Sequence, residues 1–232
     1  MADLAVLTMP PKADTRVCET CRSWRRREHA RCWNCQTAED QLGFVTRVLP
    51  VSLYVKPSEL REWVTFYKTP GNGARSYAEL LKNTLRDFLE AYGSAIREDF
   101  GSLDFATPIP ATKSSGNAVS QLFGPSSQLL APLRNTLEFS TGASPKPGTY
   151  DPTWLDVTTN VRDSRVAVVD DVYTSGVHAQ SASAALRNHG AEVPFILVIA
   201  RRINPDFTVE AGALWEEQSA LRYDLSTLPY WR

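Results

Sequence analysis

The chain has 232 residues, of which 43% are hydrophobic and 22% charged, and its formal net charge is -1. Such a composition is typical of a globular protein, and the near-neutral charge argues against a nucleic-acid-binding domain that covers most of the chain. No apolar run approaches the ~20 residues that cross a bilayer. The first 16 residues also lack a charged segment leading into an apolar signal core. We therefore expect a cytoplasmic protein with no membrane partner.

A loose leader, residues 1–16, precedes a compact cysteine module. Within this module Cys18, Cys21, Cys32 and Cys35 form the pattern C-x2-C-x10-C-x2-C. Two short turns that each carry a pair of thiolates can converge on one tetrahedral zinc ion, which supplies folding energy that so short a segment lacks. A disulfide framework is disfavoured because nothing indicates secretion, and a redox pair because the C-x-x-C occurs twice. The sequence therefore predicts a structural Zn²⁺ in a ribbon spanning residues 17–43.

Between the two cysteine pairs lies the segment RSWRRREHAR, which carries five arginines, a histidine and Trp24. Arg25, Arg26 and Arg27 are candidates for contact with nucleic acid or another phosphate-rich partner. The alternative is a solvated ribbon loop without a partner, and the sequence does not decide between the two.

The following segment alternates between extended and helical patterns. FVTRVLPVSLYV, Phe44–Val55, predicts a strand, and apolar residues at spacings of three and four predict helices between residues 58 and 92. TPGNG, at 69–73, interrupts this pattern and is expected to be the loop between two helices. LDFATPIP, Leu103–Pro110, predicts a buried strand, followed by a small-residue loop and a helix that ends near Leu133.

The second half of the chain contains the clearest fold signal. STGASPKPGTYDP, Ser140–Pro152, predicts a mobile loop. It is followed by RVAVVDDVYTSGVHAQSASAALRNHG, Arg165–Gly190, and by a second apolar run, PFILVIA, Pro194–Ala200. Strand, loop, helix and strand within about 35 residues are the unit of a parallel sheet. The sequence therefore predicts an α/β fold with a parallel, doubly wound sheet in a domain of residues 44–232.

Two adjacent carboxylates stand at the end of the first of these strands. The expected strand, Val166–Val169, places Asp170 and Asp171 at the rim of the sheet. In open α/β sheets, ligands bind in the crevice at the carboxyl ends of the strands. The aspartates are therefore candidate ligand-binding residues.

The loop after the aspartates predicts a phosphate site. Thr174, Ser175 and Gly176 supply hydroxyl donors and a close backbone approach, and the helix expected near Ala179 presents unpaired N–H groups. Because carboxylates repel phosphate, the simplest ligand for both features is a sugar phosphate whose diol faces the aspartates. The alternative is a plain strand end and helix cap, where Asp, Ser and Thr are common. The complete pattern favours the ligand site.

VVDDVYTSG resembles the phosphoribosyl-pyrophosphate (PRPP) motif of the type I phosphoribosyltransferases, which has a hydrophobic strand, an acidic pair and a Thr/Ser-rich loop with glycine. The resemblance implies a sheet of that family's kind. It also implies that Asp170 and Asp171 bind the ribose 2- and 3-hydroxyls. The residues that would wrap the 5-phosphate are Thr174, Ser175, Gly176, Val177 and His178. The family usually has a hydroxyl residue at the position of His178, where an imidazole can also donate to phosphate.

Two further loops stand where this family needs them. PIPATKSSGN, Pro108–Asn117, resembles the pyrophosphate loop, in which Lys113 would be the cation and Ser114, Ser115 and Gly116 the backbone donors. A solvated loop lysine is the alternative for Lys113. The loop 140–152 occupies the slot of the flexible catalytic loop, with Lys146 and Tyr150 as candidate contacts.

The order of a four-cysteine ribbon and this motif resembles the ComF/GntX-like group of the family, and FYKTPGNGARSYAELL resembles a stretch of ComF-type proteins with a Tyr-Lys pair before a helix. The resemblance implies transfer of ribose 5-phosphate to a nitrogen acceptor with release of pyrophosphate. PRPP would bind with Mg²⁺, and Asp170, Asp171 and Lys113 would be the catalytic residues.

Two other functions remain open at this point. The protein could be a non-catalytic PRPP sensor, or a ComF-type interaction protein in DNA uptake or processing. The sequence does not identify the acceptor, because no residue indicates a particular base. It also leaves open whether the chain forms an oligomer.

Overall fold

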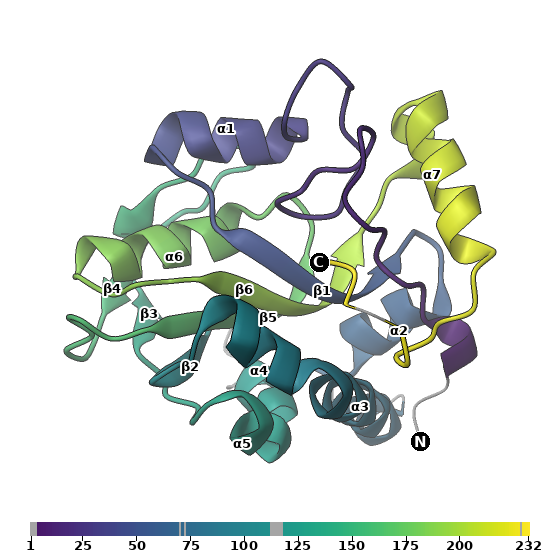
Figure 1. Cartoon of the computed structure of the whole chain (residues 1–232). Coiled ribbons are helices and arrows are strands. Elements are labelled where there is room, and N and C mark those ends of the chain that lie inside the picture. Colours follow the sequence, from purple (N-terminus) through teal and green to yellow (C-terminus); the bar gives the residue numbers. More distant parts are fainter. Residues whose placement is uncertain (1–3, 70, 72, 112–117, 228) are drawn as a thin grey trace.

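The computed structural model describes residues 4–69, 71, 73–111, 118–227 and 229–232. Within this part of the chain, the centre is a four-stranded parallel sheet in the order β1-β6-β5-β2 (Figure 1). Its strands are β1 (Arg47–Tyr54), β2 (Phe105–Pro108), β5 (Val166–Tyr173) and β6 (Phe195–Arg202). A separate antiparallel pair is formed by β3 (Leu137–Phe139) and β4 (Leu155–Val157). The predicted parallel α/β sheet is thereby confirmed.

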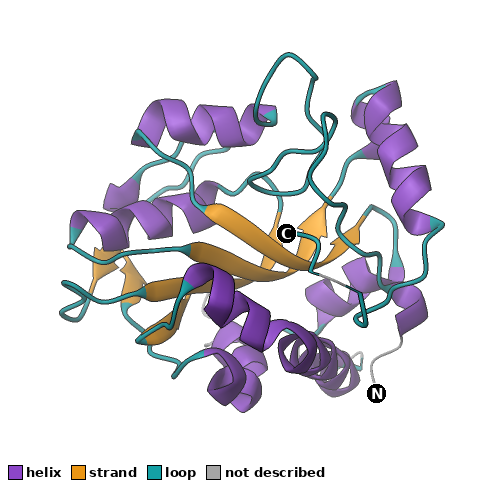
Figure 2. Ribbon diagram, in the orientation of Figure 1, coloured by secondary structure: helices purple, strands orange, loops and turns teal. Residues whose placement is uncertain are grey.

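Helices cover both faces of this sheet. Helix α6 lies on one face with α1 outside it, and α3, α4 and α5 lie on the opposite face (Figures 1 and 2). The α-helices are α1 (Trp33–Leu42), α2 (Glu59–Phe66), α3 (Ala74–Phe100), α4 (Ala118–Phe123), α5 (Ser127–Leu130), α6 (Val177–Asn188) and α7 (Val209–Ser219). Short 3-10 helices are η1 (Leu4–Val6), η2 (Gly124–Ser126), η3 (Pro152–Trp154) and η4 (Pro205–Phe207).

Neighbouring residues of the central strands enter different parts of the core, because successive strand side chains point to opposite faces. In β5, Val166 and Val168 pack in the cluster that contains α6 and the cysteines. Ala167 and Val169 pack in the cluster that contains α3. Burial on both faces explains why the β5 and β6 sequences are near-continuous apolar runs.

The helical segment is divided where the sequence predicts. Helix α2 ends at Phe66, and α3 begins at Ala74 after the TPGNG segment. The apolar stripe of α3 is buried in the main core cluster, and its residues are Leu81, Leu85, Phe88, Leu89, Tyr92 and Ile96. The helix continues beyond the predicted end near residue 92, to Phe100, where Gly101 adopts a φ of +76°.

The C-terminal region contains an element that the sequence analysis did not assign. Thr208 caps helix α7, because its side chain accepts a hydrogen bond from the N–H of Ala211. Beyond this helix, Tyr230 and Trp231 are buried in the main core cluster. The Tyr230 hydroxyl donates to the Pro50 carbonyl at 2.8 Å, so the tail is tied to β1.

Strand β5 and helix α6 correct the predicted boundaries of the motif. The sequence predicts a strand that ends at Val169 and a helix that begins near Ala179, whereas β5 extends to Tyr173 and α6 begins at Val177. The strand continues because β6 pairs with it through Tyr173. The two aspartates are therefore part of the strand, and Val177 and His178 belong to the first turn of the helix.

The cysteine module packs against the sheet. All four cysteines share a buried cluster with residues of β1, β5, β6 and α6. The N–H of Val48 in β1 also donates to the carbonyl of Thr20 at 2.7 Å. The boundary between residues 43 and 44 remains a prediction. Over the described residues, no helix combines the length and apolar character that a bilayer crossing requires.

Candidate functional site

The two aspartates lie where β5 has lost one of its neighbours. Strand β2 ends at Pro108, which pairs with Val169, whereas β6 continues beside β5 past this point. Asp170 and Asp171 therefore stand next to an open stretch of the sheet, beyond the carboxyl end of β2. This is the position at which ligands of open α/β sheets bind.

The environments of the two carboxylates differ. Asp170 is half-buried and accepts a hydrogen bond from the backbone N–H of Asp171 at 2.8 Å. Burial, and next the negative charge of Asp171, raise the pKa of Asp170 well above its ordinary value. Asp171 is only 4% exposed, and its charge is met by partners from another part of the chain.

Those partners are Tyr67 and Lys68, which follow helix α2. The Tyr67 hydroxyl donates to Oδ2 of Asp171 at 2.9 Å, and Nζ of Lys68 lies 2.6 Å from the same oxygen. Burial and the charge of Asp171 raise the pKa of Tyr67, so it is a hydrogen-bond donor at neutral pH. The sequence analysis noted this Tyr-Lys pair only as part of a resemblance. No local pattern connects it to residues about a hundred positions away.

The loop after β5 requires a glycine at position 176, because of its backbone conformation and a close contact. Gly176 has a φ of +88°, and a Cβ at this position would lie 2.1 Å from the Tyr173 hydroxyl oxygen. That hydroxyl is buried and accepts a hydrogen bond from the side chain of Gln180 at 3.2 Å. Helix α6 starts at the next residue, so the N–H groups of its first turn adjoin the loop, and the Val177 N–H lies 3.5 Å from the Ser175 hydroxyl oxygen.

A cavity of about 300 Å³ brings Asp170 and this loop together. Its walls are Asp170, residues 172–179, and residues 145–147 from the loop between β3 and β4. Lys146 is exposed and lines the cavity, so it adds a positive charge to the positive end of α6. Thr174, Ser175, Gly176, Val177 and His178 all line the same cavity, whereas Asp171 does not.

His178 lies between the cavity and the antiparallel pair. Its ring makes an edge-on contact with Phe139 of β3, with centroids 5.9 Å apart. Burial lowers the pKa of His178, so the imidazole is neutral at neutral pH. It can then offer one N–H donor, but no positive charge, to a ligand in the cavity.

Tyr150 belongs to the same loop as Lys146 but is not among the residues that line the cavity. The sequence analysis made it a candidate ligand contact, but its buried hydroxyl lies 2.9 Å from the Ser175 carbonyl and 3.0 Å from the Asn34 carbonyl. The predicted pyrophosphate loop, with Lys113, Ser114 and Ser115, lies outside the described residues, and its role stays a prediction.

The four cysteines form a candidate metal centre. Their Sγ atoms all lie within 4.8 Å of one another, all four residues are buried, and Cys21 and Cys32 approach to 3.6 Å. Zinc–sulfur bonds of ~2.3 Å in a tetrahedron put the sulfurs ~3.8 Å apart, so the cluster fits a zinc ion. Four thiolates close such a site, which favours a structural role.

Two buried arginines lie beside this centre. Nη2 of Arg201 is 3.5 Å from Sγ of Cys21, and Arg201 is only 2% exposed. Arg22 is equally buried, and its Nε and Nη1 have no hydrogen-bond partner among the described residues. A zinc ion with four thiolates carries a net charge of about -2, so two nearby guanidinium groups reduce the cost of burying it.

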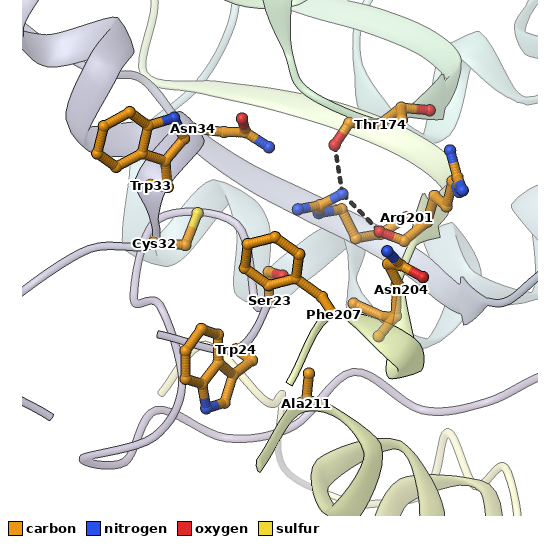
Figure 3. A pocket seen from close by; sticks show the side chains of 12 residues that line it. Ser23, Trp24, Cys32, Trp33, Asn34, Thr174, Arg201, Asn204, Phe207 and Ala211 are labelled. Carbon is orange, nitrogen blue, oxygen red and sulfur yellow. Dashed lines mark hydrogen bonds between the residues drawn. The ribbon is translucent and has the colours of Figure 1, made fainter. Parts of the chain in front are cut away.

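A second cavity, of about 270 Å³, lies between the cysteine module and the C-terminal region (Figure 3). Trp24, Trp33 and Phe207 surround it, and Asn34 and Asn204 contribute amides. Its remaining lining residues are Ser23, Cys32, Thr174, Arg201, Arg202, Ile203 and Ala211. Thr174 is common to both cavities. The two cavities are therefore separated by the loop that follows β5.

Arg25, Arg26 and Arg27 of the cysteine module have different roles. Arg25 is half-buried, and its guanidinium donates to the carbonyls of Val17, Asp14 and His29, so it holds the loop together. Arg26 and Arg27 are exposed and line a groove that also contains Trp24, Glu28 and Glu210. Their contact with nucleic acid stays a prediction.

Comparison with known proteins identifies distant structural likenesses. No family model matches the chain, and no curated protein matches its sequence. A hypoxanthine phosphoribosyltransferase from Staphylococcus aureus is similar in structure, with 12% identity, a TM-score of 0.31, and 51% of this chain and 62% of that chain covered. The UMP synthase of Leishmania donovani gives 17% identity and a TM-score of 0.34, covering 80% of this chain and 34% of that chain. The chain spans less than two thirds of either neighbour, and likenesses at this level assign neither a family nor an activity.

Proposed function

We propose that the protein is a phosphoribosyltransferase that binds PRPP and transfers its ribose 5-phosphate to a nitrogen acceptor, with release of pyrophosphate. The observation that carries this proposal is the cavity shared by Asp170 and the Thr174–Val177 loop. A carboxylate for hydroxyl groups and a helix N-terminus for phosphate line the same space. Its volume of about 300 Å³ suits a small sugar phosphate.

The 5-phosphate is assigned to the N-terminus of α6. The N–H groups of the first turn and the positive dipole end favour an anion there, and the Thr174 and Ser175 hydroxyls add donors. Lys146 faces the same space from the β3–β4 loop and supplies the charge that neutral His178 does not. Both loops therefore contribute to phosphate binding.

The ribose hydroxyls are assigned to the aspartates. Asp170 lines the cavity and is the direct acceptor, since hydrogen bonds to an ionised carboxylate are about twice as strong as neutral ones. Tyr67 donates a hydrogen bond to Asp171, and Lys68 forms an ion pair with it, beside Asp170. Asp171 therefore does not contact the ligand directly, and Tyr67 and Lys68 already compensate its charge.

Catalysis in this scheme is positioning and charge stabilisation rather than acid–base chemistry. The contacts with the 5-phosphate and the hydroxyls would together hold the ribose ring in place, and the predicted Lys113 would face the departing pyrophosphate. When bound with PRPP, Mg²⁺ would neutralise part of the pyrophosphate charge through substrate oxygens and water. Magnesium and the ComF/GntX-like subgroup remain proposals.

Pyrophosphate release is the test of the reaction. The full chain is incubated with PRPP, Mg²⁺ and a panel of bases, amides and amines, and pyrophosphate is measured. At PRPP concentrations below saturation, at least one acceptor should release pyrophosphate with the wild type, and Asp170→Asn should release about 10- to 150-fold less. PRPP binding without release for any acceptor would favour the non-catalytic sensor, and no PRPP binding would exclude both functions.

A further inference from the structure

The metal centre and the proposed phosphate loop are joined by two separate side chains. One is Arg201 of β6, and the other is Tyr150 of the loop between β3 and β4. Each contacts the backbone of the cysteine module on one side and the backbone of residues 173–175 on the other. Nothing in the order of the sequence predicts these links.

Arg201 forms the first bridge. Its Nε donates to the Cys21 carbonyl at 3.3 Å, and Nη2 lies 3.5 Å from the Cys21 sulfur. Nη1 donates to the Thr174 carbonyl at 2.6 Å and the Tyr173 carbonyl at 3.2 Å. Figure 3 shows this guanidinium beside the backbone of Thr174. A planar guanidinium fixes several acceptors in one geometry, so movement of Cys21 is transmitted to the loop.

Tyr150 forms the second bridge. Its hydroxyl lies 3.0 Å from the carbonyl of Asn34, between the second pair of cysteines, and 2.9 Å from the carbonyl of Ser175, so its single proton is shared between the two acceptors. Its own N–H donates to the side chain of Gln41 in α1 at 2.7 Å. Both cysteine pairs are thus linked to the loop, the first through Arg201 and the second through Tyr150.

The direction of these carbonyls matters for anion binding. In a trans peptide, the C=O of one residue and the N–H of the next point in opposite directions. Holding the carbonyls of Tyr173, Thr174 and Ser175 toward the metal side therefore turns the next N–H groups, those of residues 174–176, away from it. Residues 174–176 line the cavity proposed for the phosphate. The bridges thus fix the orientation of the donors that an anion would use.

We propose that the four-cysteine metal centre sets the conformation of the Thr174–Gly176 loop, with Arg201 and Tyr150 as positioning residues, so that metal binding and phosphate binding are coupled. The identity of the phosphate ligand as PRPP rests on the proposed function, whereas the coupling of metal and loop does not. Coupling of this kind is reciprocal: whatever factor the metal contributes to ligand affinity, the ligand contributes to metal affinity.

A conservative variant tests the coupling in the whole zinc-loaded chain. Tyr150→Phe removes only the bridging hydroxyl. Tyr223→Phe is the matched control, because the buried Tyr223 hydroxyl donates to the carbonyl of Val51, away from the metal centre. Amide hydrogen exchange at residues 174–177 and zinc transfer to a chromogenic chelator are measured for both variants. Tyr150→Phe should accelerate each by about 3- to 10-fold, as expected for one lost hydrogen bond.

A second measurement needs no substitution. Replacing zinc with the larger Cd²⁺, which thiolates also bind, lengthens the bonds to sulfur. The amide resonances of Ser175 and Gly176 should then shift together with those of the cysteine module. Shifts confined to residues 17–36, or a Tyr150→Phe variant equal to Tyr223→Phe in exchange and zinc transfer, would overturn the coupling.

A titration with PRPP distinguishes failure of this inference from failure of the proposed function. Titration with PRPP and Mg²⁺ should show an affinity about 3- to 10-fold lower for Tyr150→Phe than for Tyr223→Phe. If the wild type does not bind PRPP, the proposed function fails, while exchange, zinc transfer and the cadmium shifts still decide the coupling. Equal PRPP affinities in the two variants would contradict it.

Discussion

At the scale of single residues, Asp170 carries a conflict between stability and ligand binding. Burial and Asp171 raise its pKa, so folding favours the protonated form. Its contribution to stability is therefore present at pH values below its unfolded pKa of ~3.9 and is lost as the pH rises through the folded pKa. Ligand binding needs the opposite form, the ionised acceptor. Residues that oppose stability in this way are characteristic of binding sites.

Asp170→Asn should separate the two effects. We expect a gain of about 0.5–2 kcal/mol in the free energy of unfolding at pH 8, since a partly buried charge is removed. Below pH 4, where the wild-type carboxyl is protonated, the gain should disappear. Urea unfolding of both proteins across this pH range measures it. An equal stability difference at pH 4 and pH 8 would show that the charge of Asp170 is not responsible.

Gly176 gives a second residue-scale prediction. Gly176→Ala should lower the free energy of unfolding by about 1–3 kcal/mol, because its Cβ would meet the Tyr173 hydroxyl 2.1 Å away. Gly124→Ala is the control, since a Cβ there meets no atom within 4 Å and the backbone is not left-handed. Chemical denaturation compares the two variants. A Gly176→Ala protein as stable as Gly124→Ala would mean that the loop does not have this conformation.

At the scale of elements, local patterns predicted what depends on neighbours in sequence. The strand at β5, the helices on either side of TPGNG and the cysteine spacing all follow from short-range residue patterns. The antiparallel β3–β4 pair has only three residues in each strand, too few for a recognisable alternation. The contacts of Tyr67 and Lys68 with Asp171, and of Arg201 with Cys21, arise only when distant elements pack together.

Within the loop between the two cysteine pairs, Arg25 stabilises the loop, whereas Arg26 and Arg27 are exposed and free to contact a partner. If the protein binds nucleic acid, Arg26→Ala with Arg27→Ala should weaken binding and flatten its salt dependence by up to about two counterions, while the loop keeps its fold. Arg25→Ala should instead loosen the loop, because three of its hydrogen bonds are to loop carbonyls. Fluorescence anisotropy over a salt series measures the slope. An unchanged slope for the double variant would leave Arg26 and Arg27 as a solvated surface.

At the scale of the whole molecule, the metal centre is part of the main body of the fold. From the sequence, loss of zinc would unfold the N-terminal ribbon and spare the rest. Because the cysteines share a buried cluster with α6 and all four strands of the central sheet, we now expect loss of zinc to destabilise the sheet as well. The protein should carry about one zinc per chain, and chelation should lower the melting temperature of a single transition. Elemental analysis measures the zinc content, and calorimetry measures the melting temperature with and without chelator. A main transition that chelation does not shift would show instead that the ribbon folds independently of the sheet.

The central claim is that Asp170 and the loop of residues 174–177 form a PRPP site, and direct titration tests it. Calorimetry is run with PRPP and Mg²⁺ on the wild type, on Asp170→Asn and on Asp163→Asn. Asp163→Asn is the control, because Asp163 is exposed and lies outside the cavity. Asp170→Asn should bind PRPP about 10- to 150-fold more weakly, the loss expected for one hydrogen bond to a charged group worth ~1.5–3 kcal/mol. Asp163→Asn should match the wild type. Equal PRPP affinity in all three proteins, or no binding to the wild type, would contradict the account.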